Sequence, residues 1–160
     1  MFDQTPPAWI DELRIGDLVL CDLPPADRPE EAALRRPWLL LDRFTRTGGP
    51  CLALAPLQQA RLQAQRGYEI VVAMPRDLRS AGLRRRAVFA CRRPRIVPVE
   101  EFRGTRIGRL QGDRLERLNA VRARLDAERD IRRERLLLAD HASGASPSRS
   151  TFRGPGSAAV

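Results

Sequence analysis

The chain has 160 residues, 42% of them hydrophobic, which is enough for one domain core with a segment left over. All 29 of its basic residues are arginine, which excludes chemistry that needs a lysine, such as a Schiff base or a phosphate-loop lysine. His141 is the one histidine and Ser80 is the first serine, so a Ser-His-Asp triad or a histidine-rich metal site has few residues to draw on. We therefore expect no metal and no other cofactor.

The first 80 residues read as short strands separated by turn-rich loops. The clearest strands are the apolar runs at 17–23 and 38–42, and further strands are expected at 51–57 and 68–73. The segment 58–65 has no clear apolar face and is compatible with a short helix or a loop.

Residues 87–97 read as another strand, apolar through Cys91 and then basic. Pro94 implies an edge position or a bulge, because proline cannot donate to a sheet ladder. Short strands without alternating helices predict a mainly β fold with a small barrel rather than a parallel sheet.

A C-terminal helix is expected at 112–139, because this segment has strong helix formers and no proline. The sequence is thus divided into a lead-in at 1–12, a barrel at 13–111, the helix, and a disordered tail at 140–160. The apolar stripe of the helix is formed by Leu115, Leu118, Val121 and Leu125.

The net charge of +9 and the pI of about 11.2 favour a polyanionic partner, nucleic acid before an anionic membrane. Residues 71–135 hold 19 arginines against 9 acidic residues, so the basic character belongs to the second half of the chain. The expected RNA-binding arginines stand between Asp77 and Glu100 without an acidic residue among them: Arg84, Arg85, Arg86, Arg92, Arg93 and Arg95.

The helix arginines are expected to neutralise themselves instead. Acidic residues stand four positions from Arg117, Arg122 and Arg132, a spacing typical of solvated ion pairs along one helix face. An alternative interpretation is that the arginines reflect the codon usage of a GC-rich genome, although uniform codon bias does not explain their clustering.

The three cysteines, Cys21, Cys51 and Cys91, each lie in an apolar stretch far from the others. This pattern predicts buried free thiols, with a metal or disulfide role as the alternative. The sequence shows neither a signal-peptide pattern nor a membrane-spanning apolar run, so we expect a cytoplasmic protein without membrane contact.

A series of short motifs resembles the MazF/PemK/Kid toxin family over roughly residues 13–125. In chain order, the series consists of Gly16–Asp17–Leu18–Val19, Arg36–Pro37, Ala55–Pro56–Leu57, Gly82–Leu83, the segment 91–95 (CRRPR) and the segment 106–110 (RIGRL). The ordered series carries the resemblance, because each motif alone is too short to be specific.

The resemblance implies an SH3-like barrel of the CcdB/MazF plasmid-maintenance toxin type, usually a homodimer. It implies the toxin half of a type II toxin–antitoxin pair, with an antitoxin protein as partner. It further implies a metal-independent endoribonuclease that cleaves single-stranded RNA; DNA is a second candidate nucleic acid.

The resemblance places catalysis on Arg36, the arginine of the family's Arg-Pro motif, and on Gln58, which stands where the family commonly has a functional threonine. Arg35, which precedes Arg36, is expected to bind RNA. The PemK/Kid branch carries a catalytic arginine before the cysteine and an aspartate after it, whereas this chain has Ala90 and Arg92.

A carboxylate base is therefore missing, and Glu30 or Glu31, in the loop before Arg36, is a hypothetical replacement. Two functions stay open at this point. One is a toxin-type endoribonuclease, and the other is a weak or inactive barrel of the same fold that binds nucleic acid or an antitoxin-like partner.

Overall fold

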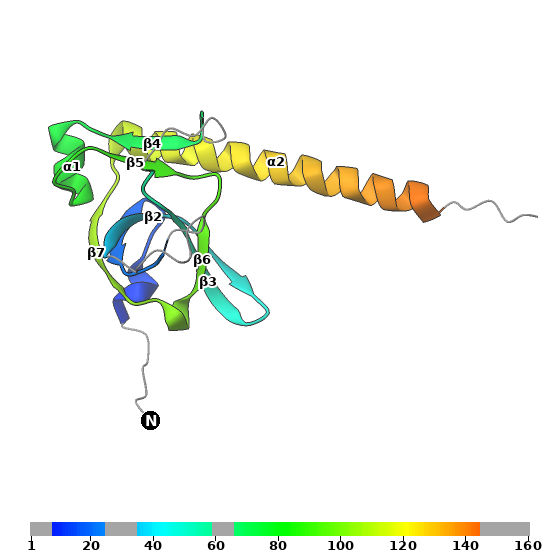
Figure 1. Ribbon diagram of the computed structural model, residues 1–160, viewed down its shortest axis with the longest axis horizontal. Helices are drawn as coiled ribbons and strands as arrows, with labels where there is room; N and C mark the ends of the chain where they lie inside the picture. Colours follow the sequence, from blue (N-terminus) through cyan, green and yellow to red (C-terminus); the bar gives the residue numbers. More distant parts are fainter. Residues whose placement is uncertain (1–7, 25–34, 59–65, 145–160) are drawn as a thin grey trace, which may run out of the picture. The chain divides into compact units, whose positions relative to one another are not determined.

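The structure is a computed structural model that describes residues 8–24, 35–58 and 66–144 (Figure 1). The chain divides into two compact units, Met1–Leu125 and Asp126–Val160. The first unit contains all the described strands, and the helix α2 (Gly112–Gly144) begins in it and ends in the second unit. A mainly β chain with a C-terminal helix is thus confirmed.

Five antiparallel strands form the main sheet, in the order β6-β3-β2-β1-β7. They are β1 (Asp17–Cys21), β2 (Arg36–Arg46), β3 (Gly49–Ala55), β6 (Arg95–Pro98) and β7 (Gly104–Arg109). A second sheet pairs β4 (Glu69–Val72) with β5 (Ala87–Ala90). Among the described residues the main sheet is open, with β6 and β7 at its edges, so the small barrel stays a prediction.

Both faces of the main sheet are buried, which explains why its strands read as continuous apolar runs. Side chains alternate between the faces, so Leu39 packs in one core and Leu40 in the other. The first core also contains Leu118 and Val121 of α2, as the helical spacing predicts. The second core defines what we call the Trp38 face of the sheet, with Val19, Cys21, Trp38, Leu40, Leu52, Leu54 and Val97.

Along the edge that faces away from β2, strand β3 pairs first with β6 and then with β5. Leu54 is opposite Arg95 of β6, and three residues further along, Leu57 forms a bridge with Phe89 of β5. Backbone hydrogen bonds from Gln58 to Val88 and from Ala90 to Pro56 extend this second pairing. Phe89 and Arg95 are six residues apart, whereas their partners on β3, Leu57 and Leu54, are only three residues apart. The chain between Phe89 and Arg95 must therefore bulge out of the ladder.

The predicted strand at 87–97 is therefore two strands, β5 and β6, separated by a bulge at residues 91–94. Pro94 lies in this bulge, where its missing N–H costs no ladder bond.

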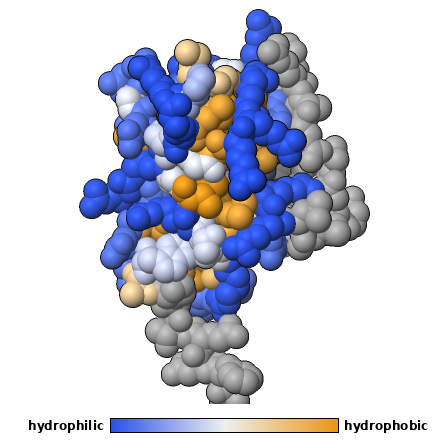
Figure 2. All heavy atoms as spheres, turned by 90° about the vertical axis from the view of Figure 1, so that its left-hand side faces the viewer, coloured by the Kyte–Doolittle hydropathy of each residue, from blue (hydrophilic) through white to orange (hydrophobic). Residues whose placement is uncertain are grey.

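The helix α1 (Pro75–Ala81) was absent from the sequence expectations. Its signals are a proline in the first turn and Gly82 as a left-handed C-cap at φ 70°. The helix lies against β7 (Figure 1), where a Cβ on Gly108 would overlap the backbone of Ala81 and Ser80. Figure 2 shows this side of the molecule, on which hydrophobic atoms lie between hydrophilic side chains. Glycine at 82 and 108 thus allows the close approach of α1 and β7.

Asp17 at the start of β1 is fully buried and pairs with Arg109 of β7 through a 2.6 Å contact between Oδ1 and Nε. Its second oxygen accepts a hydrogen bond from the backbone N–H of Arg14. The hydrogen bond to Asp17 also raises the pKa of Arg109. Among the described strands, this pair joins the first, β1, to the last, β7.

The helix α2 ends at Gly144, five residues beyond the predicted end, so residues 140–144 are helical rather than part of a disordered tail. Residues 145–160 of the expected tail lie outside the described residues. None of the described helices is both long and apolar enough to cross a membrane.

We predict that Gly108→Ala lowers the free energy of unfolding by about 2 kcal/mol, because the new methyl group overlaps fixed backbone rather than a flexible side chain. Urea denaturation monitored by circular dichroism measures the change. Gly48→Ala is the matched control, since nothing lies within 4 Å of a Cβ at that glycine. Equal midpoints for the two variants would contradict the close packing of α1 on β7.

Candidate RNA-binding and catalytic site

Arg36, Gln58 and Arg95 come from three neighbouring strands of the sheet. Arg36 begins β2 and is opposite Cys21, which belongs to the Trp38-face core. Arg95 begins β6 and is opposite Leu54 of the same core. Residues directly opposite each other in an antiparallel ladder share a face, so both arginines project from the Trp38 face.

Gln58 lies on the same face, because it follows Leu54 by four residues along the extended end of β3. The last paired residues of β2 and β3 are Leu39 and Ala55, and Arg36 and Gln58 each stand three residues beyond this pair. The register thus brings them to the same end of the sheet. All three side chains are partly exposed.

Arg35 is directed differently from Arg36. It precedes β2 and donates a 3.2 Å hydrogen bond to the hydroxyl of Thr105, which is opposite Leu20 rather than Cys21. Alternation along the strands therefore puts Arg35 on the other side of the sheet from Arg36. The structure does not bring these two predicted site residues together.

The arginine-rich window between Asp77 and Glu100 is also divided. Arg84, Arg85 and Arg86 are exposed before β5, at the end where Ala87 is opposite Val72. Arg92 and Arg93 are exposed in the bulge after β5, beyond the pair of Ala90 and Glu69. The strand between the two groups spans roughly 10 Å, so one compact footprint is not formed.

The bulge is anchored on Tyr68, whose side chain is 3% exposed. The backbone N–H of Cys91 donates to the carbonyl of Tyr68, and the guanidinium carbon of Arg92 lies 4.8 Å from the centre of its ring. The guanidinium carbon of Arg124, on α2, lies 4.5 Å from the same ring. Arg92 is thus joined to the helix through one aromatic side chain.

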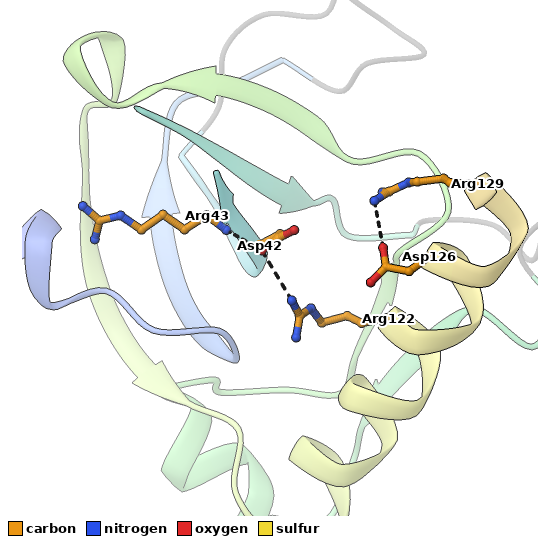
Figure 3. A network of polar contacts seen from close by, with 5 residues as sticks. All are labelled: Asp42, Arg43, Arg122, Asp126 and Arg129. Carbon is orange, nitrogen blue, oxygen red and sulfur yellow. Dashed lines mark hydrogen bonds and ion pairs between the residues drawn. The ribbon is translucent and has the colours of Figure 1, made fainter. Parts of the chain in front are cut away.

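The expectation that the helix arginines pair along the helix is wrong for Arg122, which lies 3.4 Å from Asp42 of β2 (Figure 3). Arg117 donates to the backbone carbonyl of Gly67. In the second unit Arg129 pairs with Asp126 at 3.0 Å. The helix spacing could not reveal these contacts, because the partners of Arg117 and Arg122 come from distant strands and loops.

Glu30 and Glu31, the two hypothetical replacements for the missing carboxylate base, lie outside the described residues. Glu69 of β4 is opposite Ala90 of β5, and the backbone N–H of Ala90 donates to the carbonyl of Pro56, beyond the end of β3. Glu69 is therefore two strand spacings, or about 10 Å, from Pro56. Among the described residues, no group of three His, Cys, Asp or Glu side chains is arranged to hold a metal ion.

The three cysteines are buried free thiols, as predicted. Burial raises the pKa of both Cys21 and Cys91 to about 12. Since the thiolate is the nucleophilic form, these two side chains are unsuited to covalent catalysis at neutral pH.

The chemistry available at the Trp38 face is that of phosphate recognition. A guanidinium presents donors in a planar fork that matches two phosphate oxygens, and a carboxamide adds one donor or acceptor. Gln58 cannot act as an acid or a base, since its amide does not titrate. The site can therefore bind a phosphate group and stabilise the negative charge on its oxygens.

Residues 14–125 match the family of PemK-like, MazF-like toxins of type II toxin–antitoxin systems. The chain belongs to this family, which confirms the resemblance seen in its motifs. No curated protein matches the chain. Among solved structures, a MazE–MazF crystal structure from Deinococcus radiodurans is similar, with 19% sequence identity and a TM-score of 0.45 over 74% of this chain and 96% of that chain.

We predict that Cys21 and Cys91 of the folded protein resist iodoacetamide at pH 8. With a pKa of about 12, each is ionised in only about one molecule in ten thousand at this pH, and burial also blocks access. Mass spectrometry of tryptic peptides measures labelling, and the same protein in concentrated urea is the control. Labelling of either thiol at the rate of a free cysteine would contradict the buried environment.

Proposed function

We propose that this protein is the toxin of a type II toxin–antitoxin pair and cleaves single-stranded RNA without a metal ion. It belongs to a family of type II toxins, and Arg36, Gln58 and Arg95 project from one face of the sheet on three neighbouring strands. This convergence of residues from three strands is the observation that carries the proposal. An antitoxin protein and a homodimer of SH3-like barrels are parts of the same proposal.

In the proposed reaction the ribose 2′-hydroxyl loses its proton and its oxygen bonds to the adjacent phosphorus. The bond from phosphorus to the 5′-oxygen breaks, and that oxygen gains a proton. The products are a 2′,3′-cyclic phosphate and a 5′-hydroxyl end. Negative charge gathers on the phosphoryl oxygens in the transition state, where fixed cations stabilise it most.

Arg36 and Arg95 are assigned to these oxygens, and Gln58 to a hydrogen bond with one of them. Ala90 and Arg92 stand where the PemK/Kid branch has an arginine and an aspartate. Arg95, at the start of β6, supplies a different cation along the same edge of β3. Catalysis in this protein then depends more on electrostatic stabilisation of the transition state than on an aspartate base.

We predict that Arg36→Ala lowers the rate of RNA cleavage about 100- to 1000-fold, the usual loss when one charge-stabilising donor is removed. Purified full-length protein is incubated with a long single-stranded RNA and EDTA, and fragments ending in 2′,3′-cyclic phosphate are quantified. Arg46→Ala is the matched control, because Arg46 is exposed at the other end of β2, over Phe44.

Intact RNA with the unmodified protein, together with retained RNA binding, would overturn the catalytic proposal in favour of a non-catalytic binding protein. Equal losses for the two variants would show that Arg36 acts only through general charge.

A further inference from the structure

Three guanidinium groups, one from the bulge and two from α2, lie around Gly67 and Tyr68. Arg92 of the bulge and Arg124 of α2 both lie over the Tyr68 ring, at 4.8 and 4.5 Å from its centre. Arg117 of α2 donates to the carbonyl of Gly67 at 2.9 Å. We name these three residues the Tyr68 cluster.

The geometry of α2 and of Gly67 holds the cluster together despite the repulsion between its charges. Arg117 and Arg124 are seven residues apart, which puts them on one face of α2 two turns apart. A Cβ on Gly67 would lie 3.2 Å from a terminal nitrogen of Arg124, so glycine leaves room for that side chain. The charge of Arg117 also acts on Cys91, which is adjacent to Arg92.

Gathering like charges costs free energy, and a bound anion offsets that cost. Stacking on an aromatic ring uses the face of a guanidinium, whereas its N–H donors lie in the plane of the group. The cluster thus combines oriented donors with concentrated positive charge, a combination that suits the phosphates of a nucleic acid.

The cluster also adjoins the proposed cleavage site along the chain. The bulge at 91–94 carries Arg92 toward Tyr68 and then returns to the ladder at Arg95, opposite Leu54. Leu118 and Val121 of α2 pack in the core on the opposite face of the sheet, so an RNA strand bound at Arg95 reaches the cluster around the edge formed by β6. This continuity favours RNA over an acidic protein as the occupant.

We propose that α2 forms part of the RNA-binding surface, with Arg117 and Arg124 joining Arg92 to bind phosphates beyond the scissile one. The inference rests on the proposed function and adds the helix to it. The expectation from the sequence was the opposite, that the helix arginines form a self-neutralised surface.

The test measures binding of a 2′-O-methyl single-stranded RNA, which cannot be cleaved, by fluorescence anisotropy at several salt concentrations. Arg117→Gln/Arg124→Gln is expected to weaken binding at least about tenfold and to reduce the slope of log affinity against log salt by about 1.4, the value for two lost phosphate contacts on a single strand. Arg132→Gln/Arg133→Gln is the matched control; it removes the same charge from the second unit and should leave the slope unchanged.

Arg117→Lys/Arg124→Lys keeps both charges and is expected to keep most of the slope, which separates electrostatic loss from misfolding of the glutamine variant. An unchanged slope for the glutamine pair, or an equal decrease in the control pair, would overturn the inference. Weakened binding to a polyglutamate peptide with an unchanged RNA slope would instead assign the cluster to an acidic protein. RNA that fails to bind the unmodified protein would refute the proposed function itself.

Discussion

The structure depends on a geometric constraint at strand β3, which has to pair with two different strands along one edge. Its central residues pair with β6 and its extension through Leu57 pairs with β5, although β5 and β6 follow each other in the chain. The extra residues between those strands leave the ladder as a bulge. This bulge exposes Arg92 and Arg93, anchors the chain on Tyr68, and returns it so that Arg95 occupies the Trp38 face. A regular continuous strand would instead alternate the side chains of Arg92, Arg93 and Arg95 between the two faces.

Arginine serves two different purposes in this protein. Some side chains act as structural donors: Arg43 bonds the backbone carbonyls of Ile10 and Asp11 and the carboxylate of Asp11. Such multiple contacts use the fork of a guanidinium, which lysine lacks. Others, at the Trp38 face and in the Tyr68 cluster, concentrate positive charge. The excess of arginine in the composition is therefore a mixture of internal cross-links and a surface suited to polyanions.

The sequence predicts the apolar strands and the helix well, because their signals are local: unbroken apolar runs for strands buried on both faces, and the spacing of Leu118 and Val121 on α2. It also predicts an edge position or a bulge at Pro94, and the structure has the bulge. It does not predict the face to which each arginine belongs, since register and the bulge are long-range properties. Arg35 and Arg36 lie on opposite sides of the sheet because successive residues alternate, but the register of β2 against β1 decides which of them lies on the Trp38 face. Arg117 and Arg122 likewise find partners on distant segments, where helix spacing gives no information.

The central claim is that the end of the Trp38 face holds the phosphate that is attacked. A crystal structure of the protein with a short RNA blocked by a 2′-O-methyl group at the cleavage position tests this claim most directly. The account predicts that the guanidinium groups of Arg36 and Arg95 lie within hydrogen-bond distance of the same phosphate, with Gln58 beside it. An RNA bound with its blocked phosphate over Arg84–Arg86, or on the Arg35 side of the sheet, would contradict it.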